Sequence, residues 1–495
     1  MLDDTIAAIA TPLGEGGLSV IRISGPQTLN VADRCFVPVG KNSRKPTDAA
    51  THTVQFGRIV RDGKQIDEVL LTVMRAPRTY TREDVVEIAC HGGILSTKTV
   101  LDTVLANGAR LAEPGEFTKR AFLNGRIDLT QAEAVADLIH SRTELALSAA
   151  NEQLAGKLSQ RINALRDDLM NVLAHVEAHI DFPDEDIAPD TREGLEMKLG
   201  RSIRFMNELL STANEGQILR RGVRAAIVGR PNSGKSSLLN QLLGRDRAIV
   251  SPIPGTTRDT IEEIANVRGL PVVFIDTAGL REAQDEIESE GIRRSHASLE
   301  RAEFILHVLD ASEPLTAADE KYLAEFANKK RILVRNKIDL AIKLEIPSTL
   351  SLIRKEGDAD ESLIKERVDE LQVSPDAPAR LKQAVSNHFF PPVIDVCCLS
   401  GNGIEPLKDA IKELIWSGEI KAGMLEVMIN ARHKDALRRA EDAAVRTLAA
   451  LAANLELDLV AVDLHVAVNA VGEVVGKTST EDLLDSIFRQ FCIGK

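Results

Sequence analysis

Short apolar runs separated by Gly and Pro characterise the first 124 residues. The alternation at residues 19–23 and 85–88 predicts strands, and the longer apolar period at residues 97–105 predicts a helix. This part of the chain is therefore expected to be an α+β module.

The pattern becomes helical after Asp128. Apolar residues then recur at spacings of three and four, which is the period of one helix face. A second helix is expected at about residues 191–214, and residues 425–495 are helical again, with a capping box from Thr478 to Glu481. One long helix is predicted on the stripe formed by Leu154, Leu158, Ile162, Leu165, Leu169, Val172, Val176 and Ile180.

Strands and helices alternate between about residues 223 and 416. This alternation favours a doubly wound parallel sheet. Residues 341–385 are charged with weak periodicity and are interpreted as a surface insertion in that domain. The apolar runs expected as strands are residues 225–228, 272–275, 304–308, 332–334 and 393–394.

Together these patterns predict a multidomain α/β fold. An N-terminal α+β domain is expected at residues 1–124, and an inserted nucleotide domain at residues 220–419. Because helical segments flank the inserted part, residues 125–219 and 420–495 are expected to form one discontinuous all-α domain.

Composition narrows the class of protein. The chain has 495 residues, a net charge of −13 and only 3% aromatic residues, which disfavours a platform of stacked bases and strong non-specific nucleic-acid binding. No apolar run reaches about eighteen residues, and the acidic N-terminus does not resemble a signal peptide, so neither a membrane span nor secretion is expected. Five cysteines without metal-ligand spacing fit a reduced cytoplasmic compartment.

A phosphate-binding loop is predicted at Gly229-Arg-Pro-Asn-Ser-Gly-Lys-Ser236, between an apolar strand and a helical run. Its glycines let backbone N–H groups approach phosphate at a helix N-terminus. Lys235 is expected to contact the β and γ phosphates, and the Ser236 hydroxyl to bind Mg²⁺. The nucleotide contacts expected in this loop are Asn232, Ser233, Gly234, Lys235, Ser236 and Ser237.

Two further motifs follow in order and identify the base. Asp276-Thr-Ala-Gly279 ends an apolar strand, so Asp276 can hold the Mg²⁺ shell and the Gly279 N–H can sense the γ phosphate. Asn336-Lys337-Ile-Asp339 ends a later strand, and an Asp carboxylate there accepts from guanine N1–H and its 2-amino group. Adenine offers neither donor, so the three motifs predict a GTPase.

The usual water-positioning Gln is replaced by Leu280, so another group must orient the water, and the acidic stretch 282–288 offers carboxylates. Asn232 and residues 251–259 offer oxygens for a monovalent cation beside the phosphates, and Thr257 is the expected second Mg²⁺ ligand. The loop at residues 397–401 departs from the common Ser-Ala-Lys pattern, and Cys397 and Cys398 are interpreted as two small buried hydrophobes.

Motifs outside the nucleotide domain resemble the MnmE (TrmE) family of tRNA uridine-5-carboxymethylaminomethyl modification GTPases. The resemblance covers nearly the whole chain. It is carried by Asp4-Thr-Ile-Ala-Ala-Ile-Ala-Thr-Pro12, Tyr80-Thr-Arg-Glu-Asp-Val-Val-Glu87, His91-Gly-Gly93, Pro114-Gly-Glu-Phe-Thr-Lys-Arg-Ala-Phe-Leu-Asn124, Asp128-Leu-Thr-Gln-Ala-Glu-Ala134 and Phe491-Cys-Ile-Gly-Lys495.

This resemblance implies an N-terminal domain that dimerises and binds 5-formyl- or 5,10-methylene-tetrahydrofolate, and a helical domain that carries an inserted Ras-like P-loop GTPase domain. It implies a K⁺-stimulated GTPase in a heterotetramer with an FAD-containing MnmG-like subunit, acting on the wobble uridine of tRNA. The residues that match family positions are Glu288 and Cys492 for catalysis, Asn232, Ser251, Ile253 and Thr256 for K⁺ (Ser251, Thr256 and Thr257 also for GTP), and Arg22, Glu87, Arg126 and Lys495 for folate.

Other interpretations remain open from the residues alone. A GTP-dependent switch in ribosome or RNA assembly would share the phosphate loop, and a folate-dependent one-carbon transferase could use GTP as a regulator. Arg22 and Glu87 are also compatible with an ordinary strand ion pair, and Cys492 with packing at a helix end. His175 and His179 have a spacing able to hold a metal but lack a third ligand, so a solvated helix face is expected there.

Overall fold

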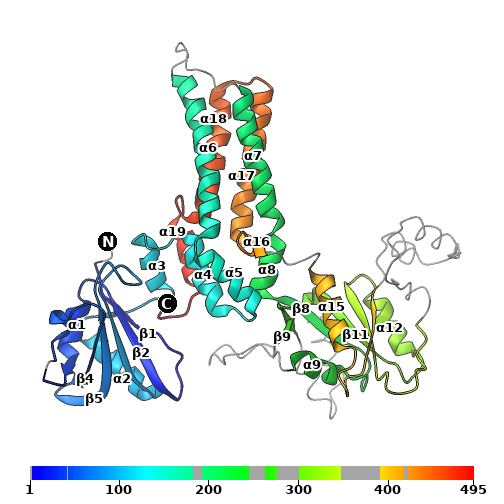
Figure 1. Ribbon diagram of the computed structural model, residues 1–495, viewed down its shortest axis with the longest axis horizontal. Helices are drawn as coiled ribbons and strands as arrows, with labels where there is room; N and C mark the ends of the chain where they lie inside the picture. The colour runs from blue at the N-terminus through cyan, green and yellow to red at the C-terminus, as the bar shows by residue number, and fades with distance from the viewer. Residues whose placement is uncertain are drawn as a thin grey trace. The chain divides into compact units, whose positions relative to one another are not determined.

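The computed structural model describes residues 3–41, 43–181, 192–244, 262–275, 300–346, 391–416 and 422–495. These residues form two compact units (Figure 1). The first, here the sheet-and-bundle unit, comprises residues 1–141, 147–216 and 421–495. The second, here the nucleotide unit, comprises residues 142–146 and 217–420.

A seven-stranded sheet forms the N-terminal part of the sheet-and-bundle unit, in the order β3-β4-β5-β6-β2-β1-β7. Helices α1 (Thr28–Cys35) and α2 (Ile94–Ala106) pack on one face over a core that includes Ile21, Ile59 and Leu71. The strands predicted at residues 19–23 and 85–88 and the helix at 97–105 are confirmed. The strands are β1 (Ile6–Ile9), β2 (Gly16–Ser24), β3 (Phe36–Pro38), β4 (Thr53–Arg61), β5 (Lys64–Met74), β6 (Val85–Gly92) and β7 (Arg110–Leu111), with a short 3-10 helix at Pro46–Asp48.

The opposite face of this sheet is partly uncovered. Strand residues alternate between faces, so the neighbours of the buried Leu71 point to the other side. There Phe56 and Leu70 face each other directly across β4 and β5, and both are 47% exposed. The next row on the same face runs through Val54, Thr72, Glu87 and Arg22.

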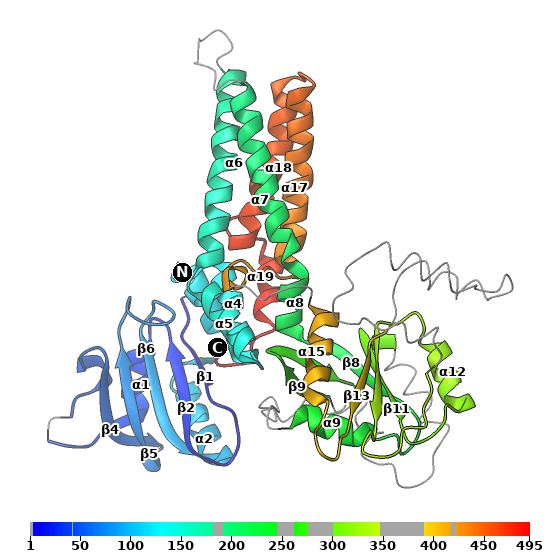
Figure 2. The same cartoon turned by 45° about the vertical axis from the view of Figure 1, so that its right-hand side comes forward.

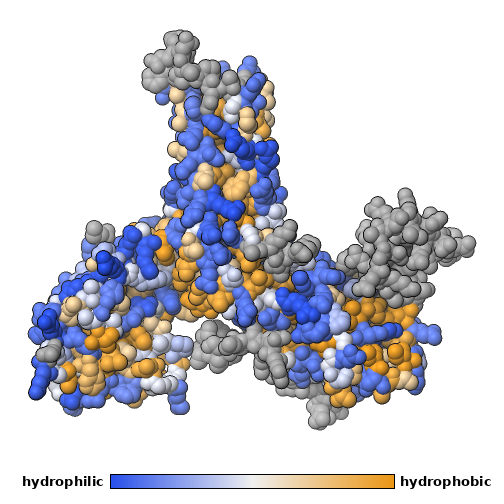
Figure 3. Space-filling view, viewed as in Figure 1, coloured by the Kyte–Doolittle hydropathy of each residue, from blue (hydrophilic) through white to orange (hydrophobic). Residues whose placement is uncertain are grey.

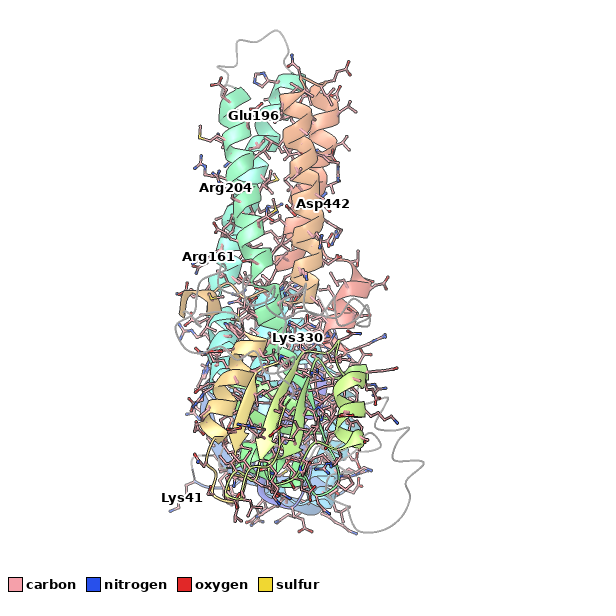
Figure 4. The ribbon with its side chains drawn as sticks, turned by 90° about the vertical axis from the view of Figure 1, so that its right-hand side faces the viewer. Lys41, Arg161, Glu196, Arg204, Lys330 and Asp442 are labelled. Atoms are coloured by element: carbon pink, nitrogen blue, oxygen red, sulfur yellow. The ribbon has the colours of Figure 1, made fainter. Side chains whose placement is uncertain are left out.

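Four long helices run side by side in the helical part (Figure 2). They bury one continuous apolar core, which holds most of the predicted stripe from Leu158 to Val176. Charged side chains such as Arg161, Arg204 and Asp442 point away from this core (Figure 4). The long helices are α6 (Lys157–Asp181), α7 (Arg192–Ser211), α17 (Ala431–Ala452) and α18 (Leu457–Val475).

The shorter helices of this part correct two predictions. The stripe from Leu154 is not one helix, because α5 (Glu144–Leu154) ends before Gly156, whose left-handed φ of +83° interrupts it. The N-cap of α19 (Glu481–Phe488) is Thr480 rather than Thr478, whose hydroxyl instead donates to Asn469 O. The remaining helices are α3 (Glu116–Leu123), α4 (Leu129–His140), α8 (Ala213–Arg221) and α16 (Ala422–Leu425).

The nucleotide unit is built on a six-stranded sheet in the order β13-β12-β11-β8-β10-β9. All neighbouring strands are parallel except the edge strand β9, so the predicted doubly wound parallel sheet is confirmed with one antiparallel edge. Helices α9 (Lys235–Leu243), α12 (Ala317–Glu325) and α15 (Ile404–Ile415) belong to the unit. Its strands are β8 (Val223–Val228), β9 (Glu263–Val267), β10 (Leu270–Phe274), β11 (Phe304–Asp310), β12 (Arg331–Asn336) and β13 (Val393–Val396).

None of the helices within the described ranges combines the length and the apolar composition that crossing a membrane requires.

His307 lies fully buried in β11, one of the two central strands, with its ring edge-on to Tyr322. Among the described residues, neither ring nitrogen has a hydrogen-bond partner. Burial, with the nearby charge of Arg331, lowers the pKa of His307 to about 4 from an ordinary 6.5, although Asp319 acts in the opposite direction. The folded nucleotide unit therefore excludes a proton that the unfolded chain binds.

We expect the free energy of unfolding to fall as the pH falls from 6.5 toward 4, because only the unfolded state takes up this proton. At about pH 5.5 the loss from this one group is about 1.4 kcal/mol relative to about pH 7.5. Urea unfolding followed by fluorescence of Trp416, the single tryptophan of the chain, measures the nucleotide unit. His307→Leu should remove this part of the pH dependence, and an unchanged pH dependence would show that His307 binds its proton equally well in the folded and unfolded states.

Candidate functional site

The phosphate loop leaves the central strand β8 and enters α9, so it lies at the carboxyl edge of the parallel sheet. Gly229 and Gly234 have left-handed φ values of +148° and +99°. A Cβ at Gly234 would overlap the Asn336 amide, and one at Gly229 would overlap Val308 O. Only glycine fits both positions, and the loop can therefore wrap closely around a phosphate.

Lys235 begins α9 and folds back over the loop. Its Nζ donates to Gly229 O at 2.9 Å and to Arg230 O at 2.8 Å. Burial lowers the pKa of this ammonium group. A phosphate oxygen is a stronger acceptor for a buried cation than two carbonyl oxygens are, so a nucleotide would draw Lys235 to its phosphates.

The rest of the loop presents its polar groups at the start of α9. Asn232 is exposed with a left-handed φ of +62°, and Ser237 is also exposed. Ser236, the predicted Mg²⁺ ligand, lies in the first turn of α9. Arg230 pairs with Asp319 and Glu313 at 3.0 Å each, which ties the loop to the N-terminus of α12 and the preceding segment.

The loop Asn336–Asp339, which the sequence predicts to read guanine and which is here called the guanine-reading loop, follows β12 at the same edge of the sheet. Asn336 is buried, and its Nδ2 donates to Ser233 O of the phosphate loop at 2.9 Å. Asp339 is exposed, with its carboxylate available to a base. The structure thus brings the phosphate loop and the Asn336–Asp339 motif together through a direct hydrogen bond.

Asp310 is a supporting residue that the sequence analysis missed. Lys337 has a left-handed φ of +66°, and its Nζ donates to Asp310 Oδ2 at 2.6 Å. Burial alone would raise the pKa of Asp310, but hydrogen bonds from Lys337 and Ser312 outweigh it and hold the pKa below its ordinary value. A polar residue at the carboxyl end of the buried strand β11 was the signal that could have pointed to it.

Several predicted site residues lie outside the described residues. They are Ser251, Ile253, Thr256, Thr257, Asp276, Gly279 and Glu288, and most of the predicted insertion 341–385 lies there too.

The second group of predicted residues meets where the C-terminal tail packs on the N-terminal sheet. Arg22 on β2 and Glu87 on β6 form an ion pair at 2.8 Å. Arg22 Nη1 also donates to Gly494 O at 3.2 Å, across 472 residues of sequence. Gly494 has a φ of +96°, and a Cβ there would overlap Ile9 O, so the tail lies directly against β1.

The end of the tail brings Lys495 within electrostatic range of this pair, and Cys492 lies in the same tail. Burial, together with the positive charge of Arg22, lowers the pKa of Lys495, although Glu87 and Cys492 act in the opposite direction. Cys492 is exposed, and its carbonyl accepts from Gly115 N at 3.4 Å. Phe488 and Phe491 anchor the segment in a small apolar core with Leu129.

Arg126 joins the same cluster through Tyr80. Its guanidinium lies 4.8 Å from the centre of the Tyr80 ring, and its Nη1 donates to Tyr80 O. Burial raises the pKa of Tyr80, which the hydrogen bond with Thr118 and the charges of Arg126 and Arg22 partly offset. Tyr80 therefore contacts Arg126 and lies within electrostatic range of Arg22, a role that the sequence analysis did not assign.

Two further interpretations from the sequence concern an ordinary strand ion pair and a metal site. Arg22 and Glu87 do form a cross-strand ion pair, but the pair also holds the C-terminal tail. Within the described part of the chain, no group of three or more His, Cys, Asp or Glu side chains has the arrangement of a metal site.

The phosphate loop on the central strand and the guanine-reading loop beside it define this chain as a GTPase of the P-loop class. Family models for the MnmE helical domain and for the GTP-binding protein TrmE N-terminus match residues 129–492 and 5–126. A tRNA modification GTPase MnmE of Geobacillus kaustophilus is 46% identical, and one of Listeria innocua 45%, each over 99% of both chains. The chain belongs to the MnmE family.

Proposed function

We propose that this chain is a K⁺-stimulated GTPase that acts with an FAD-containing MnmG-like subunit on tRNA. The reaction would form the 5-carboxymethylaminomethyl group on the wobble uridine with a one-carbon unit from folate, in the cytoplasm. Membership in the MnmE family supports the tRNA substrate, since its curated relatives are named tRNA modification GTPases. Residues 1–124 would bind folate, residues 220–419 would hydrolyse GTP, and residues 125–219 and 420–495 would connect the two activities.

The observation that carries the proposal is the packing of the C-terminal tail on the N-terminal sheet. Cys492 is the exposed cysteine of the five that the structure describes. Its neighbour in the tail, Gly494, is held by Arg22, and Lys495 lies within electrostatic range of both Arg22 and Glu87. A GTPase that acts only as a binding switch needs no such assembly of a thiol, cations and a carboxylate.

The chemistry of this cluster fits a reduced folate. A folate combines an aromatic pterin, whose amino and ring N–H groups are donors, with an anionic glutamate tail. Glu87 supplies an acceptor for the donors, and Arg22, Arg126 and Lys495 supply positive charge for the carboxylates. We therefore propose that 5-formyl- or 5,10-methylene-tetrahydrofolate binds here and supplies the one-carbon unit.

In the nucleotide unit we propose the ligand set that the family resemblance implies. Ser236 and Thr257 would bind Mg²⁺. Asp276 would hold the Mg²⁺ shell, and the Gly279 N–H would sense the γ phosphate. Glu288 would orient the attacking water, since Leu280 cannot do so. The K⁺ ligands would be Asn232, Ser251, Ile253 and Thr256, and of these the exposed Asn232 lies on the described phosphate loop.

Folate binding to the full-length protein tests the N-terminal half of the proposal. Calorimetric titration with 5-formyltetrahydrofolate should show binding that Arg22→Ala weakens at least about tenfold, because a charge-assisted contact is lost. Arg61→Ala should bind as the wild type does, because the Arg61 side chain is exposed and pairs with the exposed Asp62. GTP hydrolysis should be unchanged in both variants. No binding by the wild type, or full binding by Arg22→Ala, would contradict this site.

We also propose that the protein is a homodimer that forms through the uncovered sheet face. Val54 is 61% exposed, and Phe56 and Leu70, each 47% exposed, lie opposite each other on the same face. Figure 3 shows hydrophobic residues, in orange, on the surface of the N-terminal domain that holds this sheet. A second copy would cover this apolar surface and lie next to the row that holds Glu87 and Arg22.

Phe56→Glu should convert the dimer to a monomer, because the contact would bury an unpaired charge in both copies. Size-exclusion chromatography with light scattering at about 10 μM measures the mass directly. His52→Glu changes an exposed residue just before β4 and serves as the charge-matched control. A wild-type monomer, or a Phe56→Glu dimer of unchanged stability, would rule out this interface.

The alternative function is a GTP-dependent switch in ribosome or RNA assembly. It predicts GTP binding without folate binding, and tRNA nucleosides that do not change when the gene is removed. The packed C-terminal tail favours the modification enzyme over this alternative.

A further inference from the structure

The two neighbouring cysteines of the nucleotide unit have different environments. Cys398 belongs to the apolar core of the unit, together with residues such as Leu407 and Ile411. Cys397 is also buried, but its Sγ lies 3.2 Å from Asp339 Oδ1, to which it donates a hydrogen bond. The expectation that both are buried is confirmed, but Cys397 is more than a packing residue.

The backbone around Cys397 is fixed on both sides. Cys397 N donates to Asn402 O at 2.9 Å, and Gly401 N donates back to Cys397 O at 2.8 Å. Gly403 completes this turn with a φ of +80°, and a Cβ there would overlap Asp395 O. Since the turn cannot shift freely, the direction of the Cys397 thiol is set by the fold.

Cys398, the next residue, is held by hydrogen bonds of its backbone to Asn336 and Gln241. Cys398 N donates to Asn336 Oδ1 at 3.1 Å, and Cys398 O accepts from Gln241 Nε2 at 2.7 Å. Strands β12 and β13 are parallel, with Asn336 opposite Val396, so the segments that follow them emerge side by side. The turn after β13 thus holds both ends of the Asn336–Asp339 motif.

We propose that Cys397 is a positioning residue for guanine selectivity, whose thiol orients the Asp339 carboxylate. Asp339 is exposed and lies in a turn outside the helices and strands. Among the described residues, the hydrogen bond from Cys397 is therefore the main contact that fixes the rotamer of Asp339. Guanine offers two donors, N1–H and the 2-amino group, and both reach one carboxylate only at a fixed orientation. Hypoxanthine offers N1–H alone and tolerates several orientations, so a fixed carboxylate favours guanine.

The test compares GDP and IDP affinities of full-length variants by competition with a fluorescent nucleotide. Cys397→Ala and Cys397→Val both remove the donor, and each should weaken GDP binding roughly five- to tenfold. IDP binding should weaken less, so the ratio of the two affinities falls. Cys397→Ser keeps a donor and should stay within about twofold of the wild-type ratio.

Cys398→Ala is the matched control, because it removes a core thiol but keeps the backbone N–H that binds Asn336. It should lower stability without changing the ratio. Trp416 fluorescence confirms that each variant is folded, and two donor-free variants of different size guard against a folding failure in one. A wild-type ratio in a folded donor-free variant, or an equal loss in Cys397→Ser, would overturn the proposal.

Discussion

Asp339→Asn should lower the affinity for GTP roughly a hundredfold, and this is one of the two largest effects expected. The Asp339 carboxylate is predicted to accept two hydrogen bonds from guanine, and hydrogen bonds to a charged group contribute about 1.5–3 kcal/mol each. Xanthine carries an oxygen in place of the 2-amino group, so the Asn side chain can donate to it and accept from N1–H. The Asp339→Asn variant should therefore lose affinity for GTP and gain affinity for XTP.

Competition binding with GTP and XTP measures this exchange. Asp395→Asn is the matched control, because the Asp395 carboxylate forms an ion pair with Arg335 on the neighbouring strand. It should leave both affinities unchanged. If Asp339→Asn keeps the wild-type preference for GTP, the base is read by other residues and the assignment of the guanine-reading loop is wrong.

Arg120→Met should destabilise the N-terminal sheet by about 3–5 kcal/mol, because it leaves buried carboxylates without their partner. Arg120 is fully buried and donates to Asp4, Glu83 and Glu116 at 2.7–3.1 Å. These contacts join α3 to the segments that precede β1 and β6. Removing the charge leaves Glu83 and Glu116, both largely buried, with fewer partners.

Hydrogen exchange measures the loss locally, which matters because Trp416 lies in the other unit. Amides of β1 and α3 should exchange on the order of a thousandfold faster in Arg120→Met. Arg61→Met, which removes an exposed ion pair at 3.9 Å, should change exchange very little. Equal protection in Arg120→Met and the wild type would mean that the buried network contributes no net stability.

The sequence predicted the elements whose signals are local. The phosphate loop needed only a strand, a glycine-rich turn and a helix in succession, and the guanine-reading loop needed only a motif at a strand end. Helix ends were less predictable: Gly156 interrupts the apolar stripe, and Thr480 rather than Thr478 caps α19. Two threonines two residues apart give equal local signals, and packing decides between them.

Contacts between distant segments could not be predicted from residue patterns. The hydrogen bond from Cys397 to Asp339 spans 58 residues and depends on the pairing of β12 with β13. The bond from Arg22 to Gly494 depends on where the C-terminal tail packs. The family resemblance pointed to Arg22 and Lys495, but the supporting roles of Tyr80 and Asp310 became visible only in the structure.

The role of the C-terminal thiol in tRNA modification is the central claim, and the nucleosides of tRNA test it most directly. Mass spectrometry would compare cells that lack the gene with cells that carry the wild type, Cys492→Ser or Cys35→Ser. Cys35 is the control thiol, since it is buried and its burial raises its pKa to about 12. We predict that the wild type and Cys35→Ser restore the modified wobble uridine and that Cys492→Ser does not. Unchanged nucleosides without the gene, or full restoration by Cys492→Ser, would contradict the account.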